Sequence, residues 1–157
     1  AHSALGDGAA AERIFRLLNP ILRTRRRADV ERYRDEPYAL AADVYSCPPW
    51  VGRGGWTWYT GAAAWLWRLG VEAILGLRRE AGALCIDPCI PPTWPGFEAW
   101  VRIGRQRVHV VVDNPDGVSR GVASMTLDGA PLDSRRVSLD PDVGGCRRSK
   151  SSPYHCC

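Results

Sequence analysis

The chain has 157 residues, of which 45% are hydrophobic and 24% charged, and its formal net charge is +4. This composition is that of a globular protein with one domain or two small ones, and it excludes collagen-like and wholly disordered chains. Lys150 is the single lysine, and acidic residues directly follow the densest arginine run, residues 23–27. That arrangement favours a solvated surface over a nucleic-acid site.

Targeting signals are not evident. The N-terminus shows no basic segment followed by an apolar one, and no apolar run reaches the roughly 18 residues of a membrane helix. We therefore expect a cytoplasmic chain without a membrane segment. The six cysteines are expected to be reduced, and their spacing, including Cys146 and the tail pair, fits no structural zinc pattern, so no metal is expected.

Helical signals dominate the first half. Apolar periodicity predicts a helix over residues 9–18, which Asn19-Pro20 ends because proline disfavours helix in the residue before it. A short helix over residues 28–34 follows. Glu36-Pro37 then predicts a third helix, with proline near its first position, which continues to Cys47-Pro48-Pro49.

Residues 51–61 combine four glycines with one arginine, three aromatic side chains and two threonines before a long apolar stretch. Glycine lets the backbone approach a ligand, and the N–H groups at a helix start attract anions. Aromatic faces suit sugar rings. The pattern therefore favours a site where an anion meets a sugar, and the alternative is a glycine-rich loop with core aromatics.

The longest predicted helix covers residues 60–80 and is apolar around most of its circumference, with Trp65 and Trp67 expected in the core. Residues 82–97 are rich in proline and cannot continue it. Period-two alternation then predicts paired strands over 98–103 and 107–112, and further strands over 122–127 and 136–139, with a tight turn at Asp128-Gly129. Residues 141–157 are expected to be disordered or to be an abnormal end of the reading frame.

Four segments together resemble the C-terminal end of the glycoside hydrolase family 94 module: residues 36–49, 51–61, 86–97 and 114–122. This module occurs in cellobiose and chitobiose phosphorylases, and the resemblance is strongest to its version at the C-terminus of cyclic β-1,2-glucan synthases. The matching segments occur in the family's order over about residues 1–140.

The resemblance implies an α-then-β fold. Residues 1–81 would be the C-terminal helices of an (α/α)6 barrel, residues 82–140 a small antiparallel β-domain with a proline-rich joint, and residues 141–157 an aberrant tail. It also implies an enzyme acting on β-glucans by inverting phosphorolysis or glucosyl transfer, in cyclic β-1,2-glucan synthesis or length control. Inorganic phosphate is then a co-substrate, with no other cofactor, and a β-glucan oligosaccharide is the partner.

Within that family pattern, Thr60 and Gly61 match the threonine–glycine pair that holds phosphate. Arg53 is expected either to guide the anion or to brace the loop, and Trp56, Trp58 and Tyr59 either to stack on sugar or to be buried against barrel helices. The family's general-acid aspartate and a phosphate-contacting histidine are expected upstream of this chain. No catalytic residue is therefore expected within the chain itself.

The chain alone is expected to be inactive. It is expected to be a fragment of an enzyme whose other regions attach to the bacterial inner membrane. Trp50 stands where the family has histidine, and Ala62 where it has serine. Two alternatives stay open: a non-catalytic carbohydrate-binding or interface module, and a non-functional truncated gene product.

Overall fold

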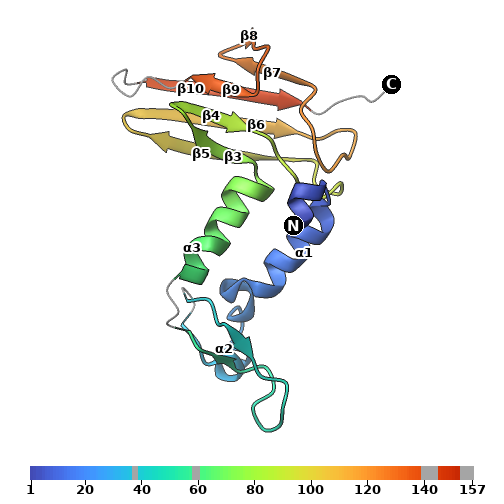
Figure 1. Ribbon diagram of the computed structural model, residues 1–157, viewed down its shortest axis with the longest axis vertical. Coiled ribbons are helices and arrows are strands. Elements are labelled where there is room, and N and C mark those ends of the chain that lie inside the picture. The colour runs from blue at the N-terminus through green and yellow to red at the C-terminus, as the bar shows by residue number, and fades with distance from the viewer. Residues whose placement is uncertain (37–38, 58–60, 139–144, 153–157) are drawn as a thin grey trace. The chain divides into compact units, whose positions relative to one another are not determined.

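A computed structural model describes residues 1–36, 39–57, 61–138 and 145–152. The chain forms two compact units, shown in Figure 1. Unit 1 combines Ala1–Glu12 with Val71–Cys157, and unit 2 is Arg13–Gly70. The domain boundaries expected from the sequence, residues 1–81, 82–140 and 141–157, stay predictions.

The first two predicted helices are confirmed. A 3₁₀ turn, η1 (His2–Leu5), precedes α1 (Gly8–Leu18). The Asp7 carboxylate accepts a hydrogen bond from the N–H of Ala10 at 2.9 Å and so caps the start of α1. Asn19 caps the 3₁₀ turn η2 (Pro20–Arg23) in the same way, and α2 (Arg27–Tyr33) follows.

The predicted third helix, from Glu36-Pro37 to Cys47, is wrong for its described residues. Instead, β1 (Asp43–Val44) pairs antiparallel with β2 (Gly54–Gly55). The chain between them is held by backbone bonds, such as that from the N–H of Tyr45 to the carbonyl of Arg53 at 2.9 Å. Pairing with the glycine segment thus satisfies backbone groups that the local periodicity assigns to a helix.

The long predicted helix is confirmed only in its first part. It comprises α3 (Gly61–Arg68) and a π-helical segment, η3 (Leu69–Ile74). Gly76 has a φ of 69°, a left-handed conformation that ends helices. The carbonyls of Ile74 and Gly76 accept hydrogen bonds from the N–H groups of Cys89 and Asp87, at 2.8 and 2.9 Å. The helix end is therefore satisfied by a neighbouring loop rather than by further helix.

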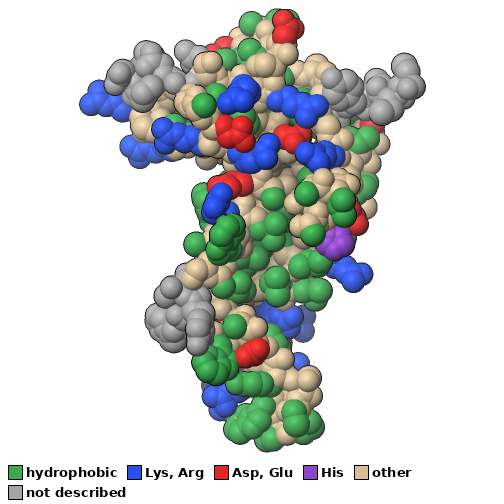
Figure 2. All heavy atoms as spheres, in the orientation of Figure 1, with side chains coloured by type: hydrophobic (Ala, Val, Ile, Leu, Met, Phe, Trp, Pro, Cys, Tyr) green, Lys and Arg blue, Asp and Glu red, His purple; other side chains and the backbone are tan. Residues whose placement is uncertain are grey.

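Trp65 and Trp67 are not core residues in this chain, since they are 68% and 63% exposed. The guanidinium of Arg68 lies over the Trp65 ring, with Cζ 5.2 Å from the ring centroid, but most of the surface of both tryptophans stays open to solvent. Figure 2 shows hydrophobic side chains gathered over the visible face of the helices.

Unit 1 contains two sheets. A three-stranded sheet has the order β3-β4-β9 and a five-stranded sheet the order β5-β6-β10-β7-β8. Their strands are β3 (Leu77–Glu80), β4 (Ala83–Ile86), β5 (Gly96–Ile103), β6 (Gln106–Asp113), β7 (Ser124–Leu127), β8 (Ala130–Pro131), β9 (Arg136–Ser138) and β10 (Gly145–Ser152).

Both sheets contribute to one core. Leu84 and Ile86 from β4 and Val108 and Val110 from β6 are at most 1% exposed and belong to the same buried cluster. The pairing of β5 with β6 confirms the predicted strands at 98–103 and 107–112. The turn at Asp128-Gly129 is also confirmed, with positive φ at both residues, as a tight hairpin turn of this kind requires. The coarse order of helices first and β-strands second therefore holds, and the strands of unit 1 pair antiparallel except for β10, which lies parallel to β6.

The expectation of a tail without structure is wrong for residues 145–152. They form β10, which pairs parallel with β6 and antiparallel with β7. The segment has no apolar periodicity, so its place in the sheet depends on backbone hydrogen bonds to strands on both sides. Ser149 is completely buried in this position.

Candidate functional site

The glycine-rich loop belongs to unit 2, and its described part is residues 51–57. Trp58, Tyr59 and Thr60 lie outside the described residues. Gly61 is described and is the first residue of α3. The structure therefore describes one of the two residues expected to hold phosphate, together with the loop that leads to it.

Three loop glycines fit against side chains of the protein itself. A Cβ atom added at Gly52 would lie 2.8 Å from Cδ of Arg32, and one at Gly54 would lie 3.2 Å from Oδ2 of Asp35. At Gly55 the nearest atom would be the Tyr45 hydroxyl, at 2.7 Å. Gly52 also has a φ of 86°, which favours glycine on its own. These glycines thus let the loop pack closely, rather than making room for a ligand.

Gly61 differs from those three. A Cβ atom there would meet nothing among the described residues closer than Cδ1 of Trp65, at 3.8 Å. The residue is also not one of those with positive φ. The described fold therefore does not require glycine at this position. Its N–H belongs to the first turn of a helix, where backbone donors have no intrahelical partner and the helix dipole favours an anion.

Arg53 braces the loop. Its guanidinium lies over the ring of Trp50, with Cζ 4.9 Å from the ring centroid, and its N–H donates to the carbonyl of Trp50 at 3.0 Å. Guidance of an anion by Arg53 stays a prediction. Trp56 is 60% exposed, so its side chain is not buried in this chain, and its backbone has a φ of 56°. Stacking of Trp56 on sugar likewise stays a prediction.

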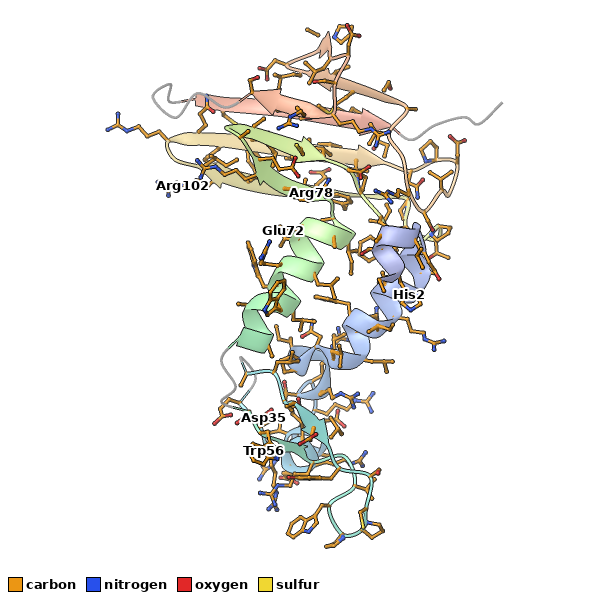
Figure 3. All side chains as sticks on the ribbon, in the orientation of Figure 1. His2, Asp35, Trp56, Glu72, Arg78 and Arg102 are labelled. Atoms are coloured by element: carbon orange, nitrogen blue, oxygen red, sulfur yellow. The ribbon has the colours of Figure 1, made fainter. Side chains whose placement is uncertain are left out.

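A buried carboxyl group beneath the loop was missed by the sequence reasoning. Asp35 is 9% exposed; its Oδ1 accepts a hydrogen bond from the N–H of Glu36 at 2.9 Å, whereas Oδ2 has no hydrogen-bond partner. Figure 3 labels Asp35, which follows α2 in the chain, and Trp56, which belongs to the loop. The available signal was the Asp35-Glu36 pair, two adjacent acids directly after a helix.

The pKa values of Asp35 and Glu36 are shifted in opposite directions. Burial raises the pKa of Asp35, and the side chain of Glu36 raises it further. Hydrogen bonds from its own backbone and from Asp35 lower the pKa of Glu36. Burial also raises the pKa of Tyr33, with the charge of Asp35 acting in the same direction. The surroundings therefore favour the neutral form of Asp35 and the charged form of Glu36.

Asp87 is a bracing residue. Its two carboxylate oxygens accept hydrogen bonds from Arg120 at 3.0 Å and Arg135 at 2.9 Å, all within unit 1. Among residues 1–36, 39–57, 61–138 and 145–152, no three His, Cys, Asp or Glu side chains are grouped so that they could hold a metal ion. The same part of the chain has no helix long and apolar enough to cross a membrane.

Comparison with known proteins assigns this architecture to a family. Residues 1–76 match the model of the glycosyl hydrolase 94 superfamily catalytic domain. The chain is 49% identical over 109 residues to the cyclic beta-(1,2)-glucan synthase NdvB of Rhizobium meliloti strain 1021, which is 68% of this chain and 4% of that protein.

Two phosphorylases are also similar. Identity is 35% over 136 residues to the N,N'-diacetylchitobiose phosphorylase of Vibrio proteolyticus, covering 86% of this chain and 17% of that enzyme. Identity is 43% over 72 residues to the 3-O-beta-D-glucopyranosyl-beta-D-glucuronide phosphorylase of Paenibacillus borealis, covering 45% of this chain and 9% of that enzyme. The chain belongs to the glycosyl hydrolase 94 superfamily, a class of carbohydrate-active enzymes, and it spans less than a fifth of each of these relatives.

Proposed function

We propose that this chain supplies the C-terminal part of a catalytic module that acts on β-glucans by phosphorolysis or glucosyl transfer, with Thr60 and Gly61 as donors to phosphate. The observation that carries the proposal is the contrast among the loop glycines. A Cβ atom at Gly52, Gly54 or Gly55 would crowd internal side chains, whereas one at Gly61 would meet only Cδ1 of Trp65, at an ordinary contact distance of 3.8 Å. A glycine at the first residue of a helix that the described fold does not need suits a ligand that approaches the backbone closely.

Similarity to relatives of two kinds supports the same proposal. The names of the Vibrio and Paenibacillus relatives imply phosphate and a sugar as reactants, and the name of the Rhizobium relative implies synthesis of a cyclic β-1,2-glucan. The proposed role for the loop is to hold a phosphate in line with the anomeric carbon, because positioning is the main contribution a binding loop makes to such a reaction. Its general acid would come from outside this chain.

Exposed apolar helix faces support a barrel as the setting. Leu17 and Leu18 on α1 are 52% and 46% exposed, and Trp65 and Trp67 on α3 are more exposed still. Apolar faces of this size need partners in a stable protein. In our proposal, α1 and α3 are the last helices of an (α/α)6 barrel, and the remaining helices cover these faces.

A chimera tests the proposed phosphate role. The matched 136-residue segment of the Vibrio enzyme is replaced by that of this chain, and phosphate-dependent cleavage of N,N'-diacetylchitobiose is measured. Thr60→Ser should keep most of the activity, whereas Thr60→Val, which has the same shape without the hydroxyl, should lose about 10- to 100-fold. A cooperatively folded chimera with no activity, or equal activity of the two variants, would refute the phosphate role of Thr60.

A non-catalytic carbohydrate-binding or interface module is the second candidate, and exposed Trp56 is the observation that favours it. Titration of the 157-residue chain with β-1,2-glucan oligosaccharides tests it. Saturable binding that Trp56→Ala abolishes would support this module, and an absence of binding would exclude it.

A further inference from the structure

Unit 2 contains a pocket that the proposed phosphate loop does not use. It lies where the end of α1, η2 and α2 meet the loop at Gly52, and its volume is about 320 Å³. Figure 1 labels α1 and α2, with α2 in the lower part of the view. The lining of this arginine pocket is Arg16, Leu17, Leu22, Arg23, Asp29, Arg32, Tyr33 and Gly52.

Its lining has an excess of positive charge, because three arginines are accompanied by one aspartate. A guanidinium stays protonated at any physiological pH, so this charge is permanent. Among the residues that the structure describes, no carboxylate forms an ion pair with Arg32 or Arg23. Asp29 offsets only one of the three positive charges of the lining, so an anion in the pocket would gain from the guanidinium groups of Arg23 and Arg32, which no described carboxylate pairs directly.

Two of the arginines contact other residues of the pocket lining. Arg23 donates through Nε and Nη2 to the carbonyl of Leu17, at 2.9 and 2.7 Å, which fixes its guanidinium at the C-terminal end of α1. Arg32 lies with Cδ against Gly52, in space that any side chain at position 52 would occupy. Binding an anion would thus require little further ordering of Arg23, while Arg32 is exposed and supplies its charge from the loop side of the pocket.

The lining of the pocket suits more than a bare ion. Leu17, Leu22 and the buried ring of Tyr33 contribute apolar surface to the same lining. The positive charge of Arg23 acts on Tyr33, where it opposes the rise in pKa that burial causes, so this arginine lies close to the phenol group. The volume is near the lower end of the range for small-molecule sites, roughly 300–1,000 Å³.

We propose that the arginine pocket binds a phosphate-bearing small molecule of the sugar-phosphate class, with Arg23 and Arg32 on the phosphate and the apolar residues of the lining against the sugar. This site is separate from Thr60 and Gly61 and does not depend on their role. Guanidinium forks match phosphate oxygens in pairs, and apolar side chains suit the carbon-bound face of a sugar ring.

Titration of the 157-residue chain with α-D-glucose 1-phosphate, inorganic phosphate and glucose, followed by calorimetry, tests the proposal. We expect glucose 1-phosphate to bind more tightly than inorganic phosphate, and glucose not to bind measurably. Equal binding of the two phosphates would show that the pocket takes the phosphate group alone and would overturn the sugar-phosphate class. No saturable binding of either would overturn the site itself.

Matched variants locate the binding. Arg32→Gln should weaken glucose 1-phosphate binding by at least about tenfold, the loss of one charge-assisted pair. Arg25→Gln removes the same charge from an exposed residue outside the pocket and should have no effect, as should Thr60→Val. An equal loss in Arg25→Gln would indicate unspecific attraction, and a loss in Thr60→Val would indicate binding at the glycine loop; either result contradicts the proposal.

A second measurement does not require any variant to fold. In the unmodified chain, NMR signals of the Gly52 amide and the Arg32 side chain should shift on addition of glucose 1-phosphate. Shifts confined to residues outside the arginine pocket would refute the site.

Discussion

Replacement of Asp35 by asparagine tests the acid pair beneath the loop. Asp35 is 9% exposed, and its Oδ2 has no hydrogen-bond partner in the described structure. Asparagine has nearly the same shape, keeps an oxygen for the N–H of Glu36, and cannot ionise. The change therefore removes one titration and leaves the packing against Gly54 almost intact.

The sign of the effect follows from the direction of the pKa shift. Burial raises the pKa of Asp35 above the ordinary value of 3.8. Between 3.8 and the raised value, the folded chain holds a proton that the unfolded chain has lost, so stability falls as pH rises. The slope is about 1.4 kcal/mol for each pH unit. The stabilising contribution of the neutral carboxyl is complete below 3.8 and is lost as pH rises through the folded pKa.

Asp35→Asn should consequently be more stable than the unmodified chain at neutral pH, by about 1.4 kcal/mol for each unit by which the pKa of Asp35 is raised, because asparagine has no charged form to bury. The difference should shrink as pH falls toward 3.8. Urea unfolding followed by tryptophan fluorescence, at pH values on both sides of 3.8, measures it. A variant that is less stable at neutral pH, or a difference independent of pH, would refute the reasoning.

Glu36→Gln is the control with the opposite sign. The pKa of Glu36 is lowered, so its ionised form contributes stability that is present above the ordinary value of 4.5 and is lost as pH falls through the lowered pKa. This variant should be less stable than the unmodified chain at neutral pH and should approach it in acid. Identical pH profiles for the two variants would show that the acids do not differ in protonation.

Further predictions concern unit 1 and are measured by urea unfolding of the full chain. Gly76→Ala should cost at least about 3 kcal/mol, because its Cβ would lie 2.1 Å from the Asp87 carbonyl and φ is 69°. Gly82 has a φ of 76° but open space around it, so Gly82→Ala should cost only about 1–2 kcal/mol. Equal costs for the two variants would contradict the close contact between position 76 and Asp87. Asp87→Ala should cost about 1–2 kcal/mol, because two half-exposed arginines lose their partner; no loss would show that the brace is dispensable. Ser149→Ala should be neutral or stabilising by up to about 1 kcal/mol, because its buried hydroxyl has no partner; a clear loss would indicate a hidden hydrogen bond.

The sequence was most informative where local pattern and final contacts agree. Alternating residues of β5 and β6 face the shared core, and Asp128-Gly129 supplies a turn whose geometry is local. Local side chains also mark the start of α1, which Asp7 caps, and of η2, which Asn19 caps. In these cases neighbouring residues are enough to define the structure.

Errors arose where distant residues decide the structure. The segment before Cys47 reads as a helix, yet β1 is extended because it pairs with Gly54 and Gly55. Similarly, β10 has no apolar pattern and depends on strands β6 and β7. Gly76 was a local signal that the long apolar run obscured, since its left-handed φ ends the helix before β3.

For the candidate site, sequence pattern found the loop but not the reasons for its glycines. Three of them touch Arg32, Asp35 and Tyr45, which are distant from them in sequence. Such contacts have no local signature, so the burial of Asp35 could not be predicted either. The resemblance of motifs identified Gly61, and the structure adds that the described fold has no need of glycine there.

The most direct test of the central claim is the KM for phosphate of the Vibrio chimera carrying Gly61→Ala. The added methyl group has room in the described fold, with its nearest neighbour at 3.8 Å, so the melting temperature should not change. If phosphate approaches this backbone closely, KM for phosphate should rise at least about tenfold while KM for the disaccharide stays constant. Unchanged phosphate KM in a folded variant would contradict the account.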